Sequence, residues 1–121
     1  AFKEIFADFD NVDTMIFDEI DTGISGRTAQ IVGEKILDLS KRRQVISISH
    51  LPQIASLASN HILISKRDVG DYTISSTEKI EEDNRTNEIA RLIGGVNITD
   101  ITINSASEML TMAEELRNER R

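Results

Sequence analysis

This sequence has no cysteine, no long hydrophobic stretch and fewer basic than acidic residues. Without cysteine, the chain can form neither a disulfide framework nor a metal site that depends on thiolate ligands. Its apolar runs are far shorter than the roughly 20 residues that a membrane-spanning helix needs. The 14 Lys and Arg against 21 Asp and Glu give a net charge of −7, which argues against direct binding to a nucleic-acid backbone. With 39% hydrophobic residues in 121 positions, the composition indicates a single globular unit.

Two adjacent carboxylates follow a short apolar run near the start of the chain. The run Met15-Ile16-Phe17 precedes Asp18 and Glu19, and its composition predicts an interior strand of a parallel sheet. Ligands of such sheets bind outside the carboxyl ends of the strands. Because side chains alternate along a strand, one acid could hold a divalent metal while the other orients a water for attack on phosphorus. Acid pairs are also common in ordinary turns, so the doublet alone does not establish this chemistry.

A histidine follows the second predicted strand. The loop 21–26 leads into a predicted helix over residues 27–41, and Ser25 is placed as its N-cap. Residues 44–49 then form a strand that ends at His50. If the two strands are parallel neighbours joined by the helix, the imidazole lies at the same edge as the acid pair. A lone histidine here could be structural, but next to two acids we interpret it as functional.

The remaining residues predict structural elements. Strands are expected over 61–66 and 72–77, and helices over 84–93 and from residue 99 or 100 to 118. His61 begins the third strand, at the edge opposite the acids, and we interpret it as structural. We therefore expect an α/β fold with a parallel three-strand core between residues 13 and 66, an antiparallel hairpin and two C-terminal helices.

Three stretches together carry a resemblance to a known family. They are Ile16-Phe17-Asp18-Glu19-Ile20-Asp21, Gly23-Ile24-Ser25-Gly26-Arg27-Thr28-Ala29 and Ser49-His50-Leu51-Pro52-Gln53-Ile54-Ala55. In this combination the chain resembles the C-terminal ATPase segment of the RecN family, whose members are structural-maintenance-of-chromosomes (SMC) like ABC-type ATPases. The resemblance extends over nearly the whole chain, including residues 87–95 and the last helix. The acid doublet by itself is shared by many ATPases, whereas the combination is specific.

The resemblance implies a catalytic role for three residues. Asp18 corresponds to the Walker B aspartate, which holds Mg²⁺ directly or through a water. Glu19 corresponds to the neighbouring carboxylate that positions the attacking water. His50 corresponds to the switch histidine, which contacts the γ-phosphate of ATP and helps to stabilise charge in the transition state. ATP and Mg²⁺ are therefore the cofactors implied for the full-length protein.

The loop after the acid pair corresponds to the D-loop of the family. The residues implied here are Asp21, Gly23, Ser25 and Gly26. In this group the loop crosses to the partner subunit when two ATPase heads close on ATP, so the resemblance implies a homodimer through the heads. Many ABC-type proteins end this loop with aspartate where this chain has Ser25, which leaves the contribution of the loop to dimer contacts open.

Two motifs of a complete ATPase head are missing from the sequence. No Gly-x-x-x-x-Gly-Lys-Ser/Thr phosphate loop (Walker A) and no Leu-Ser-Gly-Gly type signature occurs. Residues 1–7 have helical apolar spacing and resemble the tail of the helix that follows the signature in the family. We therefore expect residues 1–121 to be one fragment, the C-terminal lobe of a head, and to be inactive in isolation.

The resemblance also implies a cellular role for the parent protein. That role is repair of DNA double-strand breaks and recombination, by ATP-driven head dimerisation, in the bacterial cytoplasm and at the nucleoid. The parent would bind DNA, but this acidic segment is not expected to do so, and no membrane partner is expected.

Two other classes of function remain open from the residues alone. A magnesium-dependent TOPRIM-type nucleic-acid enzyme also places acids at strand ends, but it needs a separate glutamate and an Asp-x-Asp pair, whereas these acids share the loop 18–21 and His50 would have no role. A receiver-like interaction module needs upstream acids and a lysine after its last core strand. Lys66 could serve as that lysine, but Asp8 and Asp10 lie on a predicted helix tail. A nuclease assay with Mg²⁺ and a phosphoryl-donor assay would separate these alternatives.

Overall fold

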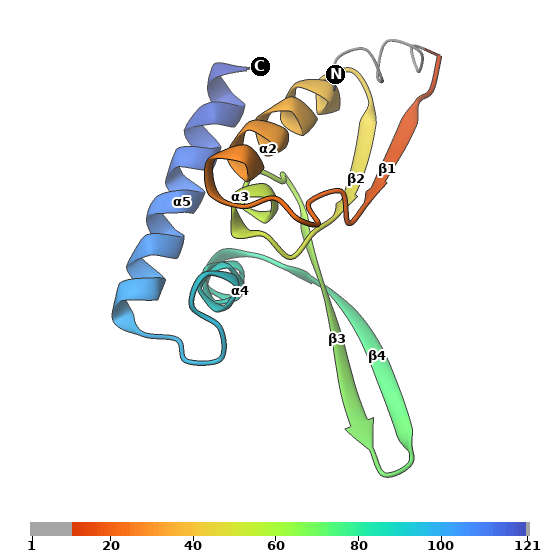
Figure 1. Cartoon of the computed structure of the whole chain (residues 1–121), viewed down its shortest axis with the longest axis vertical. Coiled ribbons are helices and arrows are strands. Elements are labelled where there is room, and N and C mark those ends of the chain that lie inside the picture. Colours follow the sequence, from red (N-terminus) through yellow and green to blue (C-terminus); the bar gives the residue numbers. More distant parts are fainter. Residues whose placement is uncertain (1–10, 121) are drawn as a thin grey trace.

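A computed structural model describes residues 11–120 of the chain. The helix tail expected over residues 1–7, and with it Asp8 and Asp10, lies outside the described residues. In chain order the elements are β1 (Thr14–Asp18), α2 (Gly26–Ser40), β2 (Gln44–Ile48), α3 (Pro52–Ala55), β3 (His61–Val69), β4 (Tyr72–Ile80), α4 (Glu82–Gly94) and α5 (Asp100–Glu119) (Figure 1). This arrangement confirms the expected α/β fold with a parallel sheet, an antiparallel hairpin and C-terminal helices.

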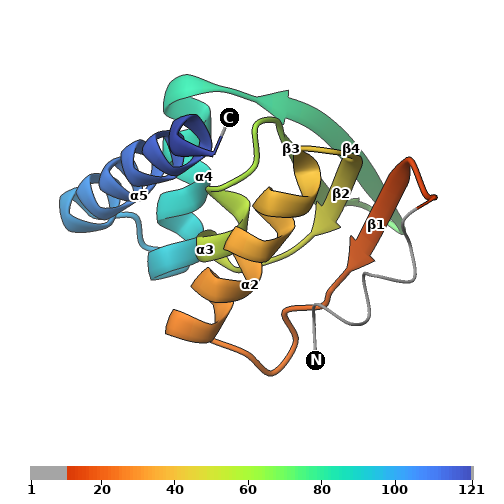
Figure 2. The same cartoon turned by 90° about the horizontal axis from the view of Figure 1, so that it is seen from above.

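Strands β1 and β2 form a parallel pair joined by α2. Alternation along β1 buries Met15 and Phe17 on one face and exposes Ile16 on the other. The buried face packs against Ile36 of α2 and Ile54 of α3, and these side chains form one hydrophobic core. Seen from above, α2 and α3 lie between this sheet and α5 (Figure 2). One face of the sheet is therefore covered by helices, and the register places the last residue of β1 beside the end of β2.

The expected third parallel strand is wrong. Strand β3 pairs antiparallel with β4, from His61 opposite Ile80 to Val69 opposite Tyr72. Among the described residues, the parallel sheet therefore consists of β1 and β2 alone. The tight turn at Gly70, whose φ is 62°, brings β4 back beside β3, so the backbone groups along one edge of β3 are paired locally. The resulting ribbon is longer than predicted and projects away from the body (Figure 1).

The two C-terminal helices pack on each other as one unit. Ile89 and Ala90 of α4 meet Ala106 of α5 in a second buried cluster. Helix α4 ends where Gly95 adopts a φ of 78°, as the Gly-Gly pair predicts. Thr99 caps α5 in a capping box. No helix in residues 11–120 combines the length and apolar character needed to cross a membrane.

Candidate functional site at the carboxyl edge of the parallel strands

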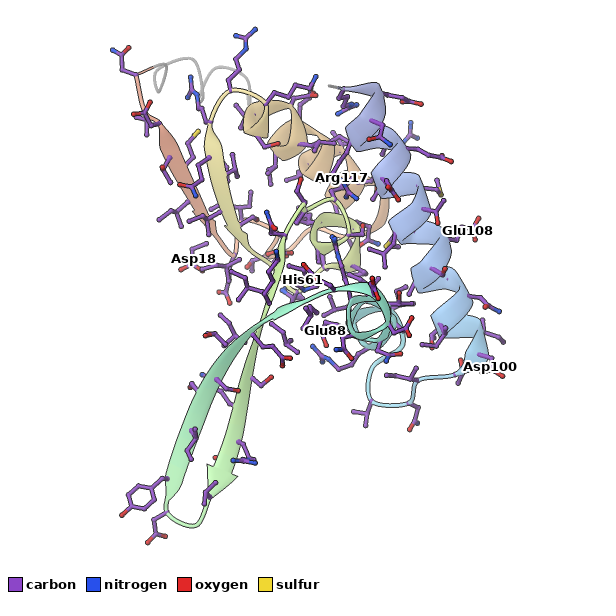
Figure 3. The ribbon with its side chains drawn as sticks, turned by 180° about the vertical axis from the view of Figure 1, so that it is seen from behind. Asp18, His61, Glu88, Asp100, Glu108 and Arg117 are labelled. Carbon is purple, nitrogen blue, oxygen red and sulfur yellow. The ribbon has the colours of Figure 1, made fainter. Side chains whose placement is uncertain are left out.

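Asp18 and Glu19 lie where β1 ends. Asp18 is opposite Ile48 in the parallel register, and the backbone N–H of Glu19 donates to the Ile48 carbonyl at 3.0 Å. Glu19 has a φ of 51°, a conformation that non-glycine residues adopt rarely, so the chain turns sharply directly after the strand. Both carboxylates are exposed, and Asp18 is seen at the end of β1 in Figure 3. The acids are thus presented at the edge that the sequence predicted.

Asp21 connects the loop after β1 to the loop after β2. Its side chain is only 1% exposed. One carboxylate oxygen, Oδ2, accepts a short hydrogen bond from the Ser49 hydroxyl and a second bond from the backbone N–H of His50 at 3.3 Å. The Ser49 oxygen in turn accepts from the backbone N–H of Leu51 at 3.0 Å. A buried carboxylate with these partners fixes the two loops relative to each other.

The His50 side chain lies at the same edge and faces solvent. Its imidazole is 69% exposed, and Nδ1 is 3.7 Å from Oδ2 of Asp21, which is beyond normal hydrogen-bond distance. The position of the ring is therefore set by the backbone of the loop after β2 rather than by burial of the ring itself. An exposed imidazole fixed in this way is available to a ligand at the edge.

The segment between Asp21 and α2 is open. Gly23 and Gly26 adopt φ values of 80° and 54°, and a Cβ at either position would meet nothing within 4 Å. Ser25 occupies the N-cap position of α2, as predicted, but its side chain makes no capping hydrogen bond. The backbone N–H and hydroxyl of Thr22 both donate to the Glu19 carbonyl. The loop is thus anchored at its start and exposed after Asp21.

The carboxylates fit a magnesium ion bound mainly by water and phosphate. Among residues 11–120, no three His, Asp or Glu side chains gather closely enough to form a metal site on their own. Mg²⁺ commonly uses one or two carboxylates and completes its shell with waters and substrate phosphates. Asp18 and Glu19 are hard oxygen ligands, and no described residue forms an ion pair with either of them. The donor set of this edge is therefore compatible with such an ion.

The anchoring contacts are not apparent from the sequence. The resemblance places Asp21 only in the D-loop and implies no role for Ser49. The signal that could have identified the contact is a polar residue just beyond each of two parallel strands, since such residues meet at one sheet edge. Arg85 and Arg117, which contact the turn after α3, are too distant in sequence for any local pattern to reveal them.

Comparison with characterised proteins identifies the relatives of this chain. No protein-family model matches it. The DNA repair protein RecN of Halalkalibacterium halodurans is 43% identical over 117 residues, which is 97% of this chain and 21% of that protein. RecN of Bacillus subtilis is 40% identical over 97% of this chain and 20% of its own length. RecN of Xylella fastidiosa is 39% identical over 88% of this chain and 19% of its own length. The chain thus spans about a fifth of the length of these relatives.

A solved structure supports the same relationship at the level of the fold. It comes from work on the ATP-driven dimerization and DNA-stimulated activation of SMC ATPases. Its TM-score is 0.64 at 20% sequence identity, and the match covers 79% of this chain and 57% of the solved one. The described fold is therefore that of part of an SMC ATPase. Because relatives named RecN align with 88–97% of this chain at 39–43% identity, the chain belongs to the RecN family.

Proposed function

We propose that this chain forms the C-terminal lobe of an ATP-hydrolysing head in a RecN-type DNA repair protein. The observation that carries the proposal is the shared edge of β1 and β2, where two exposed acids and an exposed histidine follow adjacent parallel strands. Asp18 would bind Mg²⁺, Glu19 would orient the attacking water and His50 would contact the γ-phosphate. The relationship to RecN favours this function over the nuclease and receiver alternatives.

Each residue of the edge has a separate task in this proposal. When bound, Mg²⁺ would neutralise charge on the phosphate oxygens. Glu19 accepts a hydrogen bond from the attacking water and so aligns it with the phosphorus. His50 donates to an oxygen on which negative charge develops, and its backbone is already fixed, so little reorganisation is needed. Asp21 does not contact the substrate but holds the two loops together.

The proposal requires a second lobe that supplies the phosphate loop. No such loop is present in this sequence. On the face of the sheet away from α2 and α3, Ile16, Ile46 and Ile48 are 66%, 45% and 43% exposed. An apolar face of this kind is rarely left bare on a soluble protein, and the remaining four-fifths of a RecN-length chain could cover it. We therefore expect the isolated chain to be inactive.

The proposed assembly is a dimer of heads closed by ATP. The open loop with Gly23, Ser25 and Gly26 lies beside the acids, and these three residues are exposed, so the loop is accessible to a partner head. The net charge of −7 argues against DNA contacts in this segment, so we expect the parent to bind DNA through other parts of the protein. A bacterial protein with this role would act in the cytoplasm, at the nucleoid.

ATP turnover by the full-length protein tests the proposal. Glu19→Gln keeps the size of the side chain but removes the charge that orients water, so we expect ATP binding to persist while kcat falls by about a hundredfold or more. Glu114→Gln, an exposed position on α5, is the matched control and should leave kcat unchanged. Undiminished hydrolysis by Glu19→Gln would contradict the proposal, as would Mg²⁺-dependent turnover by the isolated chain that Glu19→Gln abolishes.

A further inference from the structure

Helix α3 is a single turn that begins two residues after the proposed switch histidine. It spans Pro52–Ala55, and Leu51 is its N-cap residue. Isolated helices of this length are unstable in water, so the position of α3 depends on its surroundings. Pro52 and Ile54 are buried, and Ile54 packs in the core with β1 and α2. Burial fixes the first part of the turn, whereas the carbonyl groups of the segment that follows it, residues 56–58, need hydrogen-bond partners from elsewhere.

Two arginines from the C-terminal helices donate to carbonyl groups at the last residue of α3 and in the turn that follows it. Nη2 of Arg85, on α4, donates to the carbonyl oxygens of Ala55, Ser56 and Ala58 at 3.3, 3.1 and 2.6 Å. Nη1 of Arg117, on α5, donates to those of Ser56, Leu57 and Ala58 at 3.1, 3.3 and 3.4 Å. Arg117 lies on the side of α5 that faces this turn (Figure 3). The turn that follows α3 is therefore held by hydrogen bonds from two helices at once.

Because both arginines donate to this turn, their two positive charges lie close together. Burial lowers the pKa of Arg85, and the positive charge of Arg117 lowers it further. The carbonyl ends of a helix carry partial negative charge, which compensates part of this repulsion. Without that compensation, two like charges at one turn would repel each other. The hydrogen bonds to the carbonyl groups therefore favour keeping both guanidinium groups at the turn after α3.

The turn that the arginines hold is connected to the candidate site by a short stretch of backbone that includes α3. His50 is held on one side by Asp21, which accepts from its backbone N–H, and on the other side by α3, which starts two residues later. We propose that Arg85 and Arg117 are positioning residues for His50: by holding α3 they keep the imidazole at the edge that carries Asp18 and Glu19. The inference rests on the function proposed above for His50. It assigns to α4 and α5 a task beyond packing.

Amide hydrogen exchange of the full-length protein tests the positioning directly. In Arg117→Met, we expect the amides of His50 and Ile54 to exchange at least about tenfold faster, because the turn that holds them is loosened. The matched control is Arg120→Met on the same helix. Arg120 contacts Glu34 and Asp38 of α2 rather than α3, so this variant should leave those two amides unchanged. Equal protection of the His50 amide in the two variants would overturn the inference.

A second pair of variants repeats the comparison from α4. Arg85→Met should have the same effect as Arg117→Met, whereas Arg91→Met removes a pairing of the same helix with Glu88 that does not touch α3. This pair decides the question if one of the α5 variants does not fold. Faster exchange at His50 with Arg91→Met, equal to that with Arg85→Met, would indicate a general loss of stability and contradict the proposal.

A double-mutant cycle tests whether the hydrogen bonds of Arg117 affect ATP turnover through His50. We expect Arg117→Met to lower kcat about tenfold or more with little change in KM. In a His50→Ala background the same substitution should cost nothing further, because its effect passes through the imidazole. A full additional loss in that background would overturn the positioning role. If His50→Ala itself leaves turnover intact, the proposed function of His50 is wrong, and the exchange data still decide whether the arginines hold it.

Discussion

The hydroxyl of Ser49 donates a hydrogen bond to the buried carboxylate of Asp21, which precedes it by 28 residues. This contact joins the loops that follow two parallel strands. It lies beneath the exposed residues of the candidate site, and the same carboxylate oxygen accepts from the His50 backbone. The geometry of the edge therefore depends on a residue that is itself inaccessible to a ligand.

Replacing Asp21 with alanine should destabilise the protein. The substitution leaves the partly buried Ser49 hydroxyl and His50 N–H without their acceptor, which costs about 1–3 kcal/mol of the free energy of unfolding. Urea denaturation of the wild type and the variant measures this loss. Asp71→Ala, an exposed position beside the hairpin turn, serves as the control and should change stability by no more than about 0.5 kcal/mol. Equal stabilities of the two variants would contradict the anchoring role.

The stability should fall as the pH drops below the usual pKa of histidine, and His61 should be a cause. Burial lowers the pKa of His61 below 6.5, and the positive charge of Arg85 lowers it further, against a smaller opposing effect of Glu88. As the pH falls through 6.5, the unfolded chain therefore binds a proton before the folded chain does, which favours unfolding. Denaturation between pH 7.5 and 5.5 measures the slope.

The contribution of His61 can be separated from that of other groups. His61→Gln removes the titration of His61 and should flatten the pH dependence of the free energy of unfolding. A slope that is the same in the wild type and in His61→Gln would show that burial of His61 does not affect stability in this range.

The packing of α2 on α3 should not tolerate a larger residue at Gly33. A Cβ placed there would come within 2.6 Å of the Leu57 side chain and 3.4 Å of the Gln53 carbonyl oxygen. Gly33→Val should therefore lower the free energy of unfolding by about 1–3 kcal/mol through overpacking. Lys35→Val, exposed on the same helix, loses only helix propensity and should lower the free energy of unfolding by about 0.5 kcal/mol. Thermal denaturation distinguishes the two, and equal losses would refute the close contact.

A charge on the open face of the parallel sheet should have opposite effects in the segment and in the whole protein. In the isolated chain, Ile16→Glu should reduce self-association, because it breaks up an exposed apolar face. In the full-length protein the same change should lower solubility or stability if another lobe covers that face. Val96→Glu, at a loop position that is 96% exposed, is the control. Sedimentation velocity on both proteins gives the result, and an identical effect in the two contexts would contradict a covered face.

Local patterns predicted most of the elements, and long-range contacts account for what they missed. The strands that end at Asp18 and Ile48 could be predicted, because apolar runs flanked by turn residues mark both of them in the sequence. The position of β3 was not, since its pattern fits a parallel core strand as well as a hairpin, and only the pairing decides. The hydrogen bonds from Arg117 to the turn after α3 join residues about 60 apart in the chain. No sequence spacing indicates a contact over such a separation.

The hairpin of β3 and β4 has a consequence for handling the protein. Two-stranded ribbons are marginally stable in water unless something packs on them, and here both strands are exposed beyond Leu63 and up to Lys79. Trypsin could cut such a ribbon after Lys66 or Arg67 whenever the outer half opens. Resistance to trypsin at these two bonds would therefore report whether the ribbon is sheltered by the rest of a longer polypeptide, without any measurement of catalysis.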